Sequence, residues 1–169
     1  MQGKLAEFLA ESKQLGFTAI EVSDGSTTVA RDQRLAVIAQ AKAAGFTVLA
    51  EAGKKNPAKD HQLTVADRVT QVKDDLAAGV DHVIIEAREA GKNIGIYDEQ
   101  GQVLEEVLQP LLALGKDHLI FEAPLKSQQV TLLKQLGPDA NFGNVAPADI
   151  ISLQTLRQGL RGDTVGAFS

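Results

Sequence analysis

Four glutamates recur along the chain, each at the end of a short apolar run. A fifth run carries an asparagine at the matching offset, and the five residues are Glu21, Glu51, Glu86, Glu122 and Asn144. One such glutamate is most often a solvated loop residue, but four in register are harder to explain in that way. If the runs are parallel strands of one sheet, their ends meet at the edge where ligands bind. Carboxylates gathered there indicate a metal site or an acid–base site.

Two lysines follow the second glutamate, in the segment Glu51-Ala52-Gly53-Lys54-Lys55. Compact ammonium groups beside a strand end suit an anionic substrate. A lysine partly withdrawn from water can also act as a general acid or form a Schiff base. The alternative is an ordinary solvated loop. The segment is not a Walker loop, because it lacks the upstream glycine and the Ser or Thr.

Two further segments follow strand ends. Arg88 can clamp a carboxylate or phosphate with two hydrogen bonds, or form a structural ion pair with a neighbouring glutamate. The segment Lys126-Ser127-Gln128 opens a helix, whose free N–H groups suit a phosphate. The alternative there is a plain helix cap, for which Ser127 is a candidate N-cap.

Helical patterns separate the apolar runs, and each pattern leads into a glycine that can adopt the left-handed turn of a helix end. Short runs rich in Val, Ile and Phe are typical of buried parallel strands. The predicted strands are Thr18–Val22, Phe46–Ala50, His82–Ile85, His118–Phe121 and Ala140–Val145. The predicted helices are Leu5–Leu15, Ala30–Ala44, Val65–Ala78, Gln102–Leu114, Gln128–Leu136 and Ala148–Leu160. The order is one helix and then five βα units, which predicts a parallel α/β fold.

Two architectures fit five βα units in 169 residues. The length alone favours a flavodoxin-like open sheet. Polar residues at corresponding strand ends favour a (β/α)8 barrel of the TIM type, in which all strand ends face one site. We expect a single domain over residues 1–169.

The composition excludes several classes of function. The chain has no cysteine, which rules out disulfides and thiol chemistry, and its formal net charge of −5 argues against general nucleic-acid binding. No apolar run is long enough to span a membrane and no signal-peptide pattern opens the chain, so we expect a cytoplasmic protein. His82 and His118 follow aspartates at strand starts, far from the glutamates, and are expected to be structural.

The residues resemble those of the phosphosulfolactate synthases along essentially the whole chain. The matching segments are Glu21-Val22-Ser23-Asp24-Gly25, Glu51-Ala52-Gly53-Lys54-Lys55 with Lys59-Asp60 and Gln62-Leu63-Thr64, Val83-Ile84-Ile85-Glu86-Ala87-Arg88-Glu89, Phe121-Glu122-Ala123-Pro124 with Lys126-Ser127-Gln128-Gln129, Ile151-Ser152-Leu153 and Leu156-Arg157-Gln158-Gly159-Leu160-Arg161-Gly162-Asp163-Thr164.

The resemblance implies a (β/α)8 barrel and a lyase-type enzyme that adds sulfite to phosphoenolpyruvate with Mg²⁺. The product, phosphosulfolactate, is an early precursor of coenzyme M in some organisms and of sulfolactate in others. The family pattern places the proton-donating lysine at Lys55. From the chemistry we expect Lys54 and Arg88 to hold anions. We expect the remaining roles to fall to Glu21, Glu51 and Glu86 as Mg²⁺ ligands, and to Lys126, Ser127, Gln128 and Asn144 at the substrate.

The resemblance also implies three further βα units before the matching region, so this chain corresponds to the C-terminal five of eight. Five strands cannot close a barrel, and two buried-type strands are left as edges that invite association. We therefore expect the chain alone to be weakly active or inactive and to form homo-oligomers. The alternatives are a non-catalytic structural or stress-related relative, as in plant proteins that resemble this family, an inactive fragment of the enzyme, and a Schiff-base aldolase that uses Lys54 or Lys55.

Overall fold

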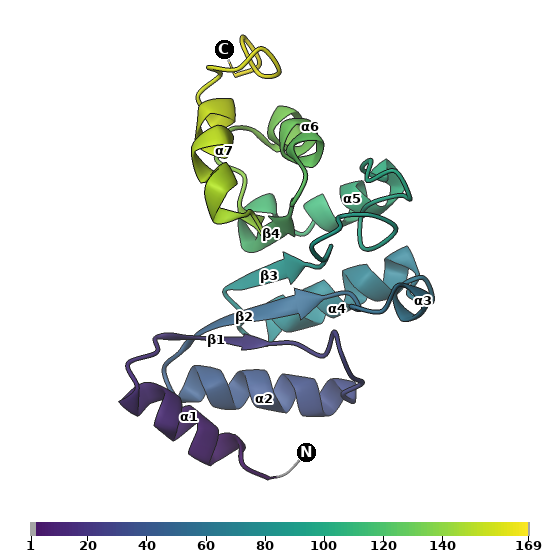
Figure 1. The fold of residues 1–169 in the computed structure, drawn as a ribbon. Helices are drawn as coiled ribbons and strands as arrows, with labels where there is room; N and C mark the ends of the chain where they lie inside the picture. The colour runs from purple at the N-terminus through teal and green to yellow at the C-terminus, as the bar shows by residue number, and fades with distance from the viewer. Residues whose placement is uncertain (1–2, 169) are drawn as a thin grey trace.

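Five parallel strands form one sheet in the computed structural model, which describes residues 3–168 (Figure 1). The strands are β1 (Ala19–Val22), β2 (Thr47–Ala52), β3 (His82–Ile85), β4 (Leu119–Glu122) and β5 (Phe142–Gly143). Their order in the sheet is the order in the sequence, β1-β2-β3-β4-β5. A flavodoxin-like sheet reverses its strand order at a switch point, and this sheet does not, so the flavodoxin-like alternative is wrong.

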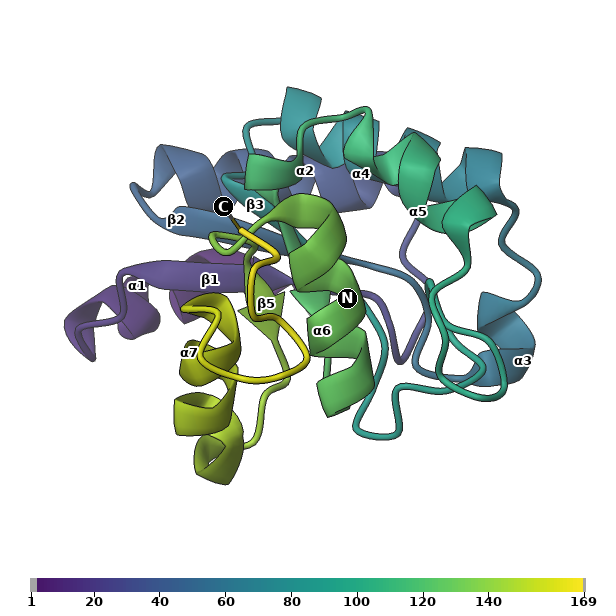
Figure 2. The same cartoon turned by 90° about the horizontal axis from the view of Figure 1, so that it is seen from above.

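Helices connect successive strands, as the predicted βα repeat requires. They are α1 (Leu5–Gln14), α2 (Arg31–Ala43), α3 (Pro57–Asp60), α4 (Val65–Ala77), α5 (Glu105–Leu112), α6 (Lys126–Leu136) and α7 (Ile150–Arg157), with short 3-10 turns at Lys116–His118 and Pro147–Asp149. Figure 2 shows α2, α4 and α5 side by side over one face of the strands. None of the helices within residues 3–168 is long and apolar enough to cross a membrane.

The local signals at helix ends explain most of these boundaries. The five helix-ending glycines all have positive φ, between 78° and 104°, which only glycine adopts without strain; they are Gly16, Gly45, Gly79, Gly115 and Gly137. Thr64 and Asp67 form a capping box at the start of α4.

Two local predictions near helix starts differ from the structure. Ser127 is not an N-cap, because α6 already begins at Lys126. The short helix α3 is not among the predicted helices. Its start carries a signal that sequence reading can use: the Asn56 side chain accepts a hydrogen bond from the Ala58 N–H, and Pro57 fills the first helical position.

The two faces of the sheet differ in what covers them. Strand residues on the helix side are fully buried and pack against residues of α2 and α4, such as Ile38 and Val72. They are Val48, Ala50, Val83, Ile85, Leu119 and Phe121. On the other face, Leu49, Ile84 and Ile120 are only half-buried. Apolar side chains therefore lie on both faces, but the helices that pack against the strands cover only one.

Candidate functional site

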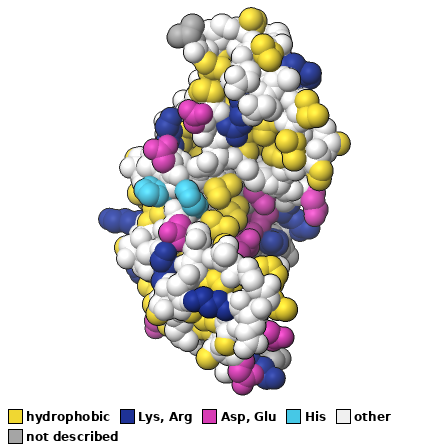
Figure 3. Space-filling model, turned by 90° about the vertical axis from the view of Figure 1, so that its left-hand side faces the viewer, with side chains coloured by type: hydrophobic (Ala, Val, Ile, Leu, Met, Phe, Trp, Pro, Cys, Tyr) yellow, Lys and Arg dark blue, Asp and Glu magenta, His cyan; other side chains and the backbone are white. Residues whose placement is uncertain are grey.

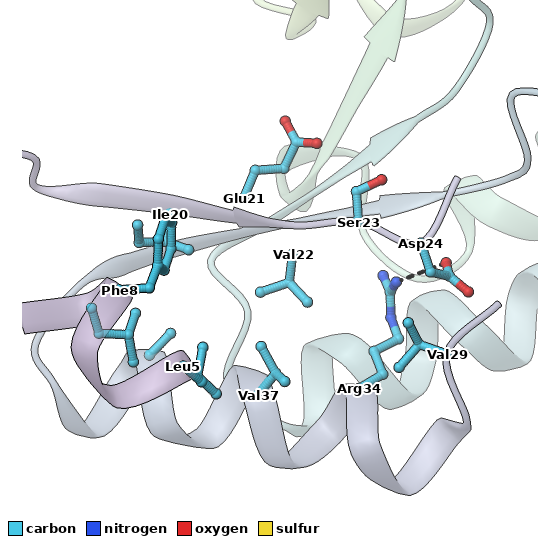
Figure 4. Close-up of a pocket in the computed structure, with 12 residues that line it drawn as sticks. Leu5, Phe8, Ile20, Glu21, Val22, Ser23, Asp24, Val29, Arg34 and Val37 are labelled. Carbon is cyan, nitrogen blue, oxygen red and sulfur yellow. Dashed lines mark hydrogen bonds and ion pairs between the residues drawn. The ribbon is translucent and has the colours of Figure 1, made fainter. Parts of the chain in front are cut away.

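The four glutamates lie at the carboxyl ends of neighbouring strands and on the same face of the sheet. Glu21 is paired in register with Leu49, Glu51 with Ile84, and Ile84 with Ile120. Because side chains alternate along a strand, all four carboxylates project from the face opposite the helices. Figure 4 shows Glu21 on that side of β1 and Val22 on the other. We call this edge, with Glu21, Glu51, Glu86 and Glu122, the rim.

Lys55 reaches across the rim to two of these carboxylates. Its Nζ lies 3.4 Å from Glu51 Oε2 and 3.7 Å from Glu86 Oε2. Both carboxylates are almost completely buried, whereas the lysine side chain is 42% exposed. Partial burial acts to lower the Lys55 pKa, but the two carboxylates outweigh it and hold the pKa above its ordinary value. The site therefore presents a charged ammonium group to solvent, with the two buried carboxyl groups of Glu51 and Glu86 beneath it.

Glu86 is the most strongly perturbed acid of the rim. Burial, and then the carboxylates of Glu122 and Glu51, raise its pKa to about 8. Its Oε2 is buried without a hydrogen-bond partner among the described residues. Glu21 has a raised pKa as well, through partial loss of solvent and then through the neighbouring Glu51. Crowded carboxylates with an unsatisfied oxygen favour the binding of a cation.

Glu122 and Arg88 organise the loop after β3. The Glu122 Oε2 accepts hydrogen bonds from the Ala87 N–H at 2.7 Å and the Arg88 N–H at 2.9 Å, and the Arg88 N–H also donates to Glu86 Oε1. The Arg88 backbone is left-handed, with φ 58°. Its guanidinium donates to the Lys55 carbonyl at 2.7 Å. Arg88 therefore joins the two loops that carry Glu86 and Lys55.

Lys54 points away from the rim although it is adjacent to Lys55. Its Nζ lies 2.5 Å from Asp24 Oδ2 and also donates to the Asp24 carbonyl. Only 14% of its side chain is exposed. This ammonium group is already paired with a carboxylate within the chain, and its predicted role in holding an anion stays a prediction.

The four predicted substrate residues lie at the carboxyl ends of β4 and β5, but in different environments. Ser127 and Asn144 are exposed, and Lys126 pairs with Asp163 at 2.5 Å. Gln128 is 1% exposed, and its amide donates to the carbonyls of Gly91 and Gly101 and accepts from the Leu125 N–H. Its polar atoms are therefore engaged inside the chain.

Gly25 lies where the loop after β1 passes close to Glu51 and Lys55. A Cβ at this position would stand 2.5 Å from Glu51 Oε1 and 3.1 Å from Lys55 Cε. The neighbouring Ser23 hydroxyl donates to Glu51 Oε1 at 2.6 Å. The lack of a side chain at Gly25 is what lets this loop lie against the site.

The predicted metal ligands do not form a complete cage. Within residues 3–168 no three acidic or histidine side chains gather closely enough to hold an ion by themselves. Glu51 and Glu86 do converge, on Lys55.

A pocket of about 170 Å³ lies next to the carboxyl end of β1, between β1, α1 and α2, and its lining is mostly apolar (Figure 4).

Two buried ion pairs near the site were missed from the sequence. Arg34 of α2 binds Asp75 of α4, and Asp60 of α3 binds Arg68 of α4. A signal was present: Arg34, Ile38 and Ala41 form one buried helix face, and Arg68, Val72 and Asp75 form another. Charges of opposite sign on buried helix faces indicate a pair, since an unpaired buried charge is very costly.

His82 and His118 lie at strand starts, as the sequence predicts, and their structural role stays a prediction. Their rings lie 6.5 Å apart at the amino ends of β3 and β4, and Figure 3 shows histidine side chains next to each other on the face that it views.

Comparison with known proteins gives the same family as the sequence motifs. The family described as ComA, (2R)-phospho-3-sulfolactate synthase, matches residues 1–163. The phosphosulfolactate synthase of Methanocaldococcus jannaschii is 51% identical over 98% of the chain, and that of Methanothermobacter thermautotrophicus is 45% identical over 98%. A Bacillus subtilis relative of the same name is 34% identical over 96% of the chain. The chain spans 66%, 65% and 65% of these relatives, respectively. It belongs to the phosphosulfolactate synthase family.

Proposed function

We propose that the protein adds sulfite to phosphoenolpyruvate to give phosphosulfolactate, with Lys55 as the proton donor. The observation that carries the proposal is the Lys55 ammonium group, held between Glu51 and Glu86 at the strand ends of a chain from this family. The sulfite sulfur attacks C3 of the alkene, the electron pair of the double bond moves toward C2 and the carboxylate, and C2 then takes a proton. An exposed, charged lysine is suited to that last step.

The charge of Lys55 also disfavours the aldolase alternative. A Schiff-base lysine must present a neutral amine, and enzymes achieve this by lowering its pKa. The two carboxylates raise the Lys55 pKa instead. Lys54 is unsuited to this role as well, because its amine is already bound to the Asp24 carboxylate.

The fold supports the proposal that the five βα units work as one part of a (β/α)8 barrel. The strands follow one another without reversal, the packing helices cover one face, and Leu49, Ile84 and Ile120 leave an apolar row on the other. Inward-facing branched side chains of this kind fill the centre of a (β/α)8 barrel. On this proposal the five βα units are part of a barrel, and the rim faces its catalytic end.

Glu51 and Glu86 fit a divalent cation, since they converge on one point and the buried Glu86 Oε2 has no hydrogen-bond partner among the described residues. Mg²⁺ is commonly held by one or two carboxylates, with water and substrate oxygens completing its shell. We therefore assign these two residues to Mg²⁺ and leave Glu21 as a nearby third carboxylate. When bound, the ion would stabilise the negative charge that develops on the substrate carboxylate. Ser127, with Lys126 and the exposed Asn144, remains our choice for the phosphate end of the substrate.

The test is consumption of phosphoenolpyruvate, followed with and without sulfite and with and without Mg²⁺. The chain is assayed alone and joined to the part of the M. jannaschii relative that it does not match. We expect the joined protein to consume phosphoenolpyruvate only when both sulfite and Mg²⁺ are present, and to yield a sulfonated product. Turnover without sulfite, or borohydride trapping of a lysine adduct with a carbonyl substrate, would contradict the proposal.

A further inference from the structure

Arg34 is a buried cation that the proposed reaction does not use directly. It lies on α2 and is 5% exposed. Its guanidinium donates to both carboxylate oxygens of Asp75, at 2.9 and 2.7 Å, to Asp24 Oδ1 at 3.1 Å and to the Glu51 carbonyl at 3.0 Å. One side chain thus joins α4, the loop after β1 and the end of β2; Figure 4 shows its contact with Asp24.

The groups that Arg34 holds are those that shape the site. Asp24 begins the turn whose next residue, Gly25, accepts the Lys55 N–H at 2.9 Å. Ser23, on the other side of Asp24, donates to the Glu51 carboxylate. The Glu51 backbone is held directly by Arg34. The loop from Ser23 to Gly25 and the end of β2 are therefore fixed to the same guanidinium.

Stability alone is a weak reason for such a network. A buried ion pair loses the hydration of both partners, and well-packed apolar residues often replace it without loss. What apolar residues cannot supply is the planar, directional contact of a guanidinium with three elements at once. The directional hydrogen bonds of Arg34 therefore indicate that it fixes the relative positions of these elements.

We propose that Arg34 is a positioning residue of the site, which sets Glu51 and Lys55 relative to each other by fixing the Ser23–Gly25 loop against the end of β2. Through Asp24 it also keeps Lys54 away from the rim, so that Lys55 alone presents its charge there. The catalytic meaning of this role rests on the proposed function, but the placement of the loop can be measured without it.

The same two helices supply a matched control. Arg31 of α2 pairs with Asp74 of α4 at 2.5 Å, one turn from the Arg34–Asp75 pair. The Arg31 side chain is 64% exposed, and its ion pair joins α2 only to α4. Arg31→Lys and Arg34→Lys therefore make the same chemical change in the same helix. Only Arg34→Lys removes the guanidinium group that bonds to Asp75, Asp24 and the Glu51 carbonyl.

The experiment measures amide hydrogen exchange at Lys55, whose N–H bonds to Gly25, in the full chain. We expect Arg34→Lys to speed exchange at Lys55 about tenfold or more, and Arg31→Lys to change it less than about twofold. The amide of Gly137, which donates to the Leu133 carbonyl at the end of α6, lies outside the Arg34 network and is expected to stay unchanged. Equal exchange at Lys55 in both variants would overturn the proposal.

A second variant decides the question if Arg34→Lys does not fold. Asp24→Asn leaves the Arg34–Asp75 pair in place and weakens the links of the Ser23–Gly25 loop to Arg34 and to Lys54. It is expected to speed exchange at Lys55 in the same direction, and a change of less than about twofold would contradict the proposed role.

Kinetics separate this inference from the proposed function. In protein that turns over phosphoenolpyruvate, we expect Arg34→Lys to lower kcat by about 10- to 100-fold with KM changed less than about threefold, because small misplacement of a catalytic group mainly affects the chemical step. An unchanged kcat contradicts the positioning role. If the unmodified protein shows no sulfite-dependent turnover, the proposed function fails, and the exchange measurement still decides whether Arg34 places the loop.

Discussion

Two adjacent lysines at the end of β2 have opposite surroundings. Lys54 is bound to Asp24 and is largely covered, while Lys55 is partly exposed between two buried carboxylates. A proton donor must be charged at working pH and accessible to the substrate. Only the second lysine meets both conditions.

Lys55→Ala is therefore expected to lower kcat by about 10²- to 10⁴-fold, the range of general acid–base catalysis. The matched variant Lys54→Ala removes a structural pair and is expected to cost less than about tenfold. Steady-state rates of sulfite-dependent phosphoenolpyruvate consumption measure both. A loss on Lys54→Ala as large as that on Lys55→Ala would refute the distinction.

Glu86 predicts how stability depends on pH. Its pKa is about 8 in the folded chain and near the ordinary 4.5 when unfolded. Between these two pH values Glu86 carries a proton in the folded chain but not in the unfolded chain. The contribution of Glu86 to the free energy of unfolding is therefore complete below pH 4.5 and is lost as the pH rises through about 8. Glu86→Gln keeps the shape of the protonated acid and should reduce this loss.

Urea unfolding at pH 6 and pH 9, without divalent cations, measures the effect. The Glu86→Gln protein is expected to lose less stability over this interval than the unmodified protein, by up to about 1.4 kcal/mol per pH unit below pH 8. Glu106→Gln, on the exposed side of α5, is the control and should follow the unmodified protein. Identical pH dependence in all three proteins would rule out a protonated Glu86.

The residue types of the rim could be predicted from the sequence because parallel strands bring their ends to one edge. The split between Lys54 and Lys55 could not, since it depends on Asp24, which the fold brings up from thirty residues earlier. The partners of Gln128 could not be predicted from the sequence either. Its place at a helix start suggested a ligand contact, but its partners, Gly91 and Gly101, lie in a loop whose path the sequence does not specify.

At the scale of elements, that loop between β3 and α5 is held at both ends by Gln128. Its middle carries buried apolar residues, among them Ile94, Ile96 and Tyr97. The Gly95 N–H donates to Asp60, and a Cβ on Gly95 would stand only 2.1 Å from the Glu86 carbonyl. The loop is therefore a wall of the site, packed directly behind Glu86.

Gln128→Glu tests this arrangement. The new carboxylate keeps the size of the side chain and can still accept from Leu125, but it cannot donate to the two glycine carbonyls. We expect a loss of about 1–3 kcal/mol in unfolding free energy at pH 7, because buried acceptors are left without partners. Gln62→Glu, an exposed position, should change stability by less than about 0.5 kcal/mol. A loss of unfolding free energy in Gln62→Glu but not in Gln128→Glu would contradict the role of Gln128 in holding this loop.

The elements themselves were largely predictable. Repeated glycines at helix ends and apolar runs located five strands and six helices, and errors were confined to their ends and to α3. The fifth strand was expected over six residues and pairs over two, Phe142–Gly143. The left-handed Asn144 turns the chain directly after it. A single left-handed residue ends a strand in a way that an apolar run does not reveal.

At the scale of the whole molecule, the sheet has two edges. Among the described strands, β1 pairs only with β2 and β5 only with β4. Large apolar side chains are exposed near both: Phe8 and Phe17 by 54% and 59% close to β1, and Ile150 and Ile151 by 56% and 79% after β5. Unpaired parallel edges with apolar borders favour association with other strands.

Sedimentation velocity is expected to show concentration-dependent self-association of the chain at micromolar to millimolar concentration. Phe8→Glu combined with Phe17→Glu should weaken it, since like charges would border the β1 edge. Ala66→Glu on the exposed side of α4 adds charge elsewhere and should leave association unchanged. A monodisperse monomer at all concentrations would contradict this expectation.

The sequential strand order also determines how the chain comes apart. Each strand touches only its predecessor and successor, so most contacts join segments close in sequence, as in a repeat array. Such arrays open from their ends, and local opening requires less free energy than global unfolding. The slowest amide exchange is therefore expected in β3, the central strand, which has two strands on each side of it in the sheet. Because both Glu51 and Glu86 flank that centre, the part of the chain that carries the chemistry is also the last to lose its structure.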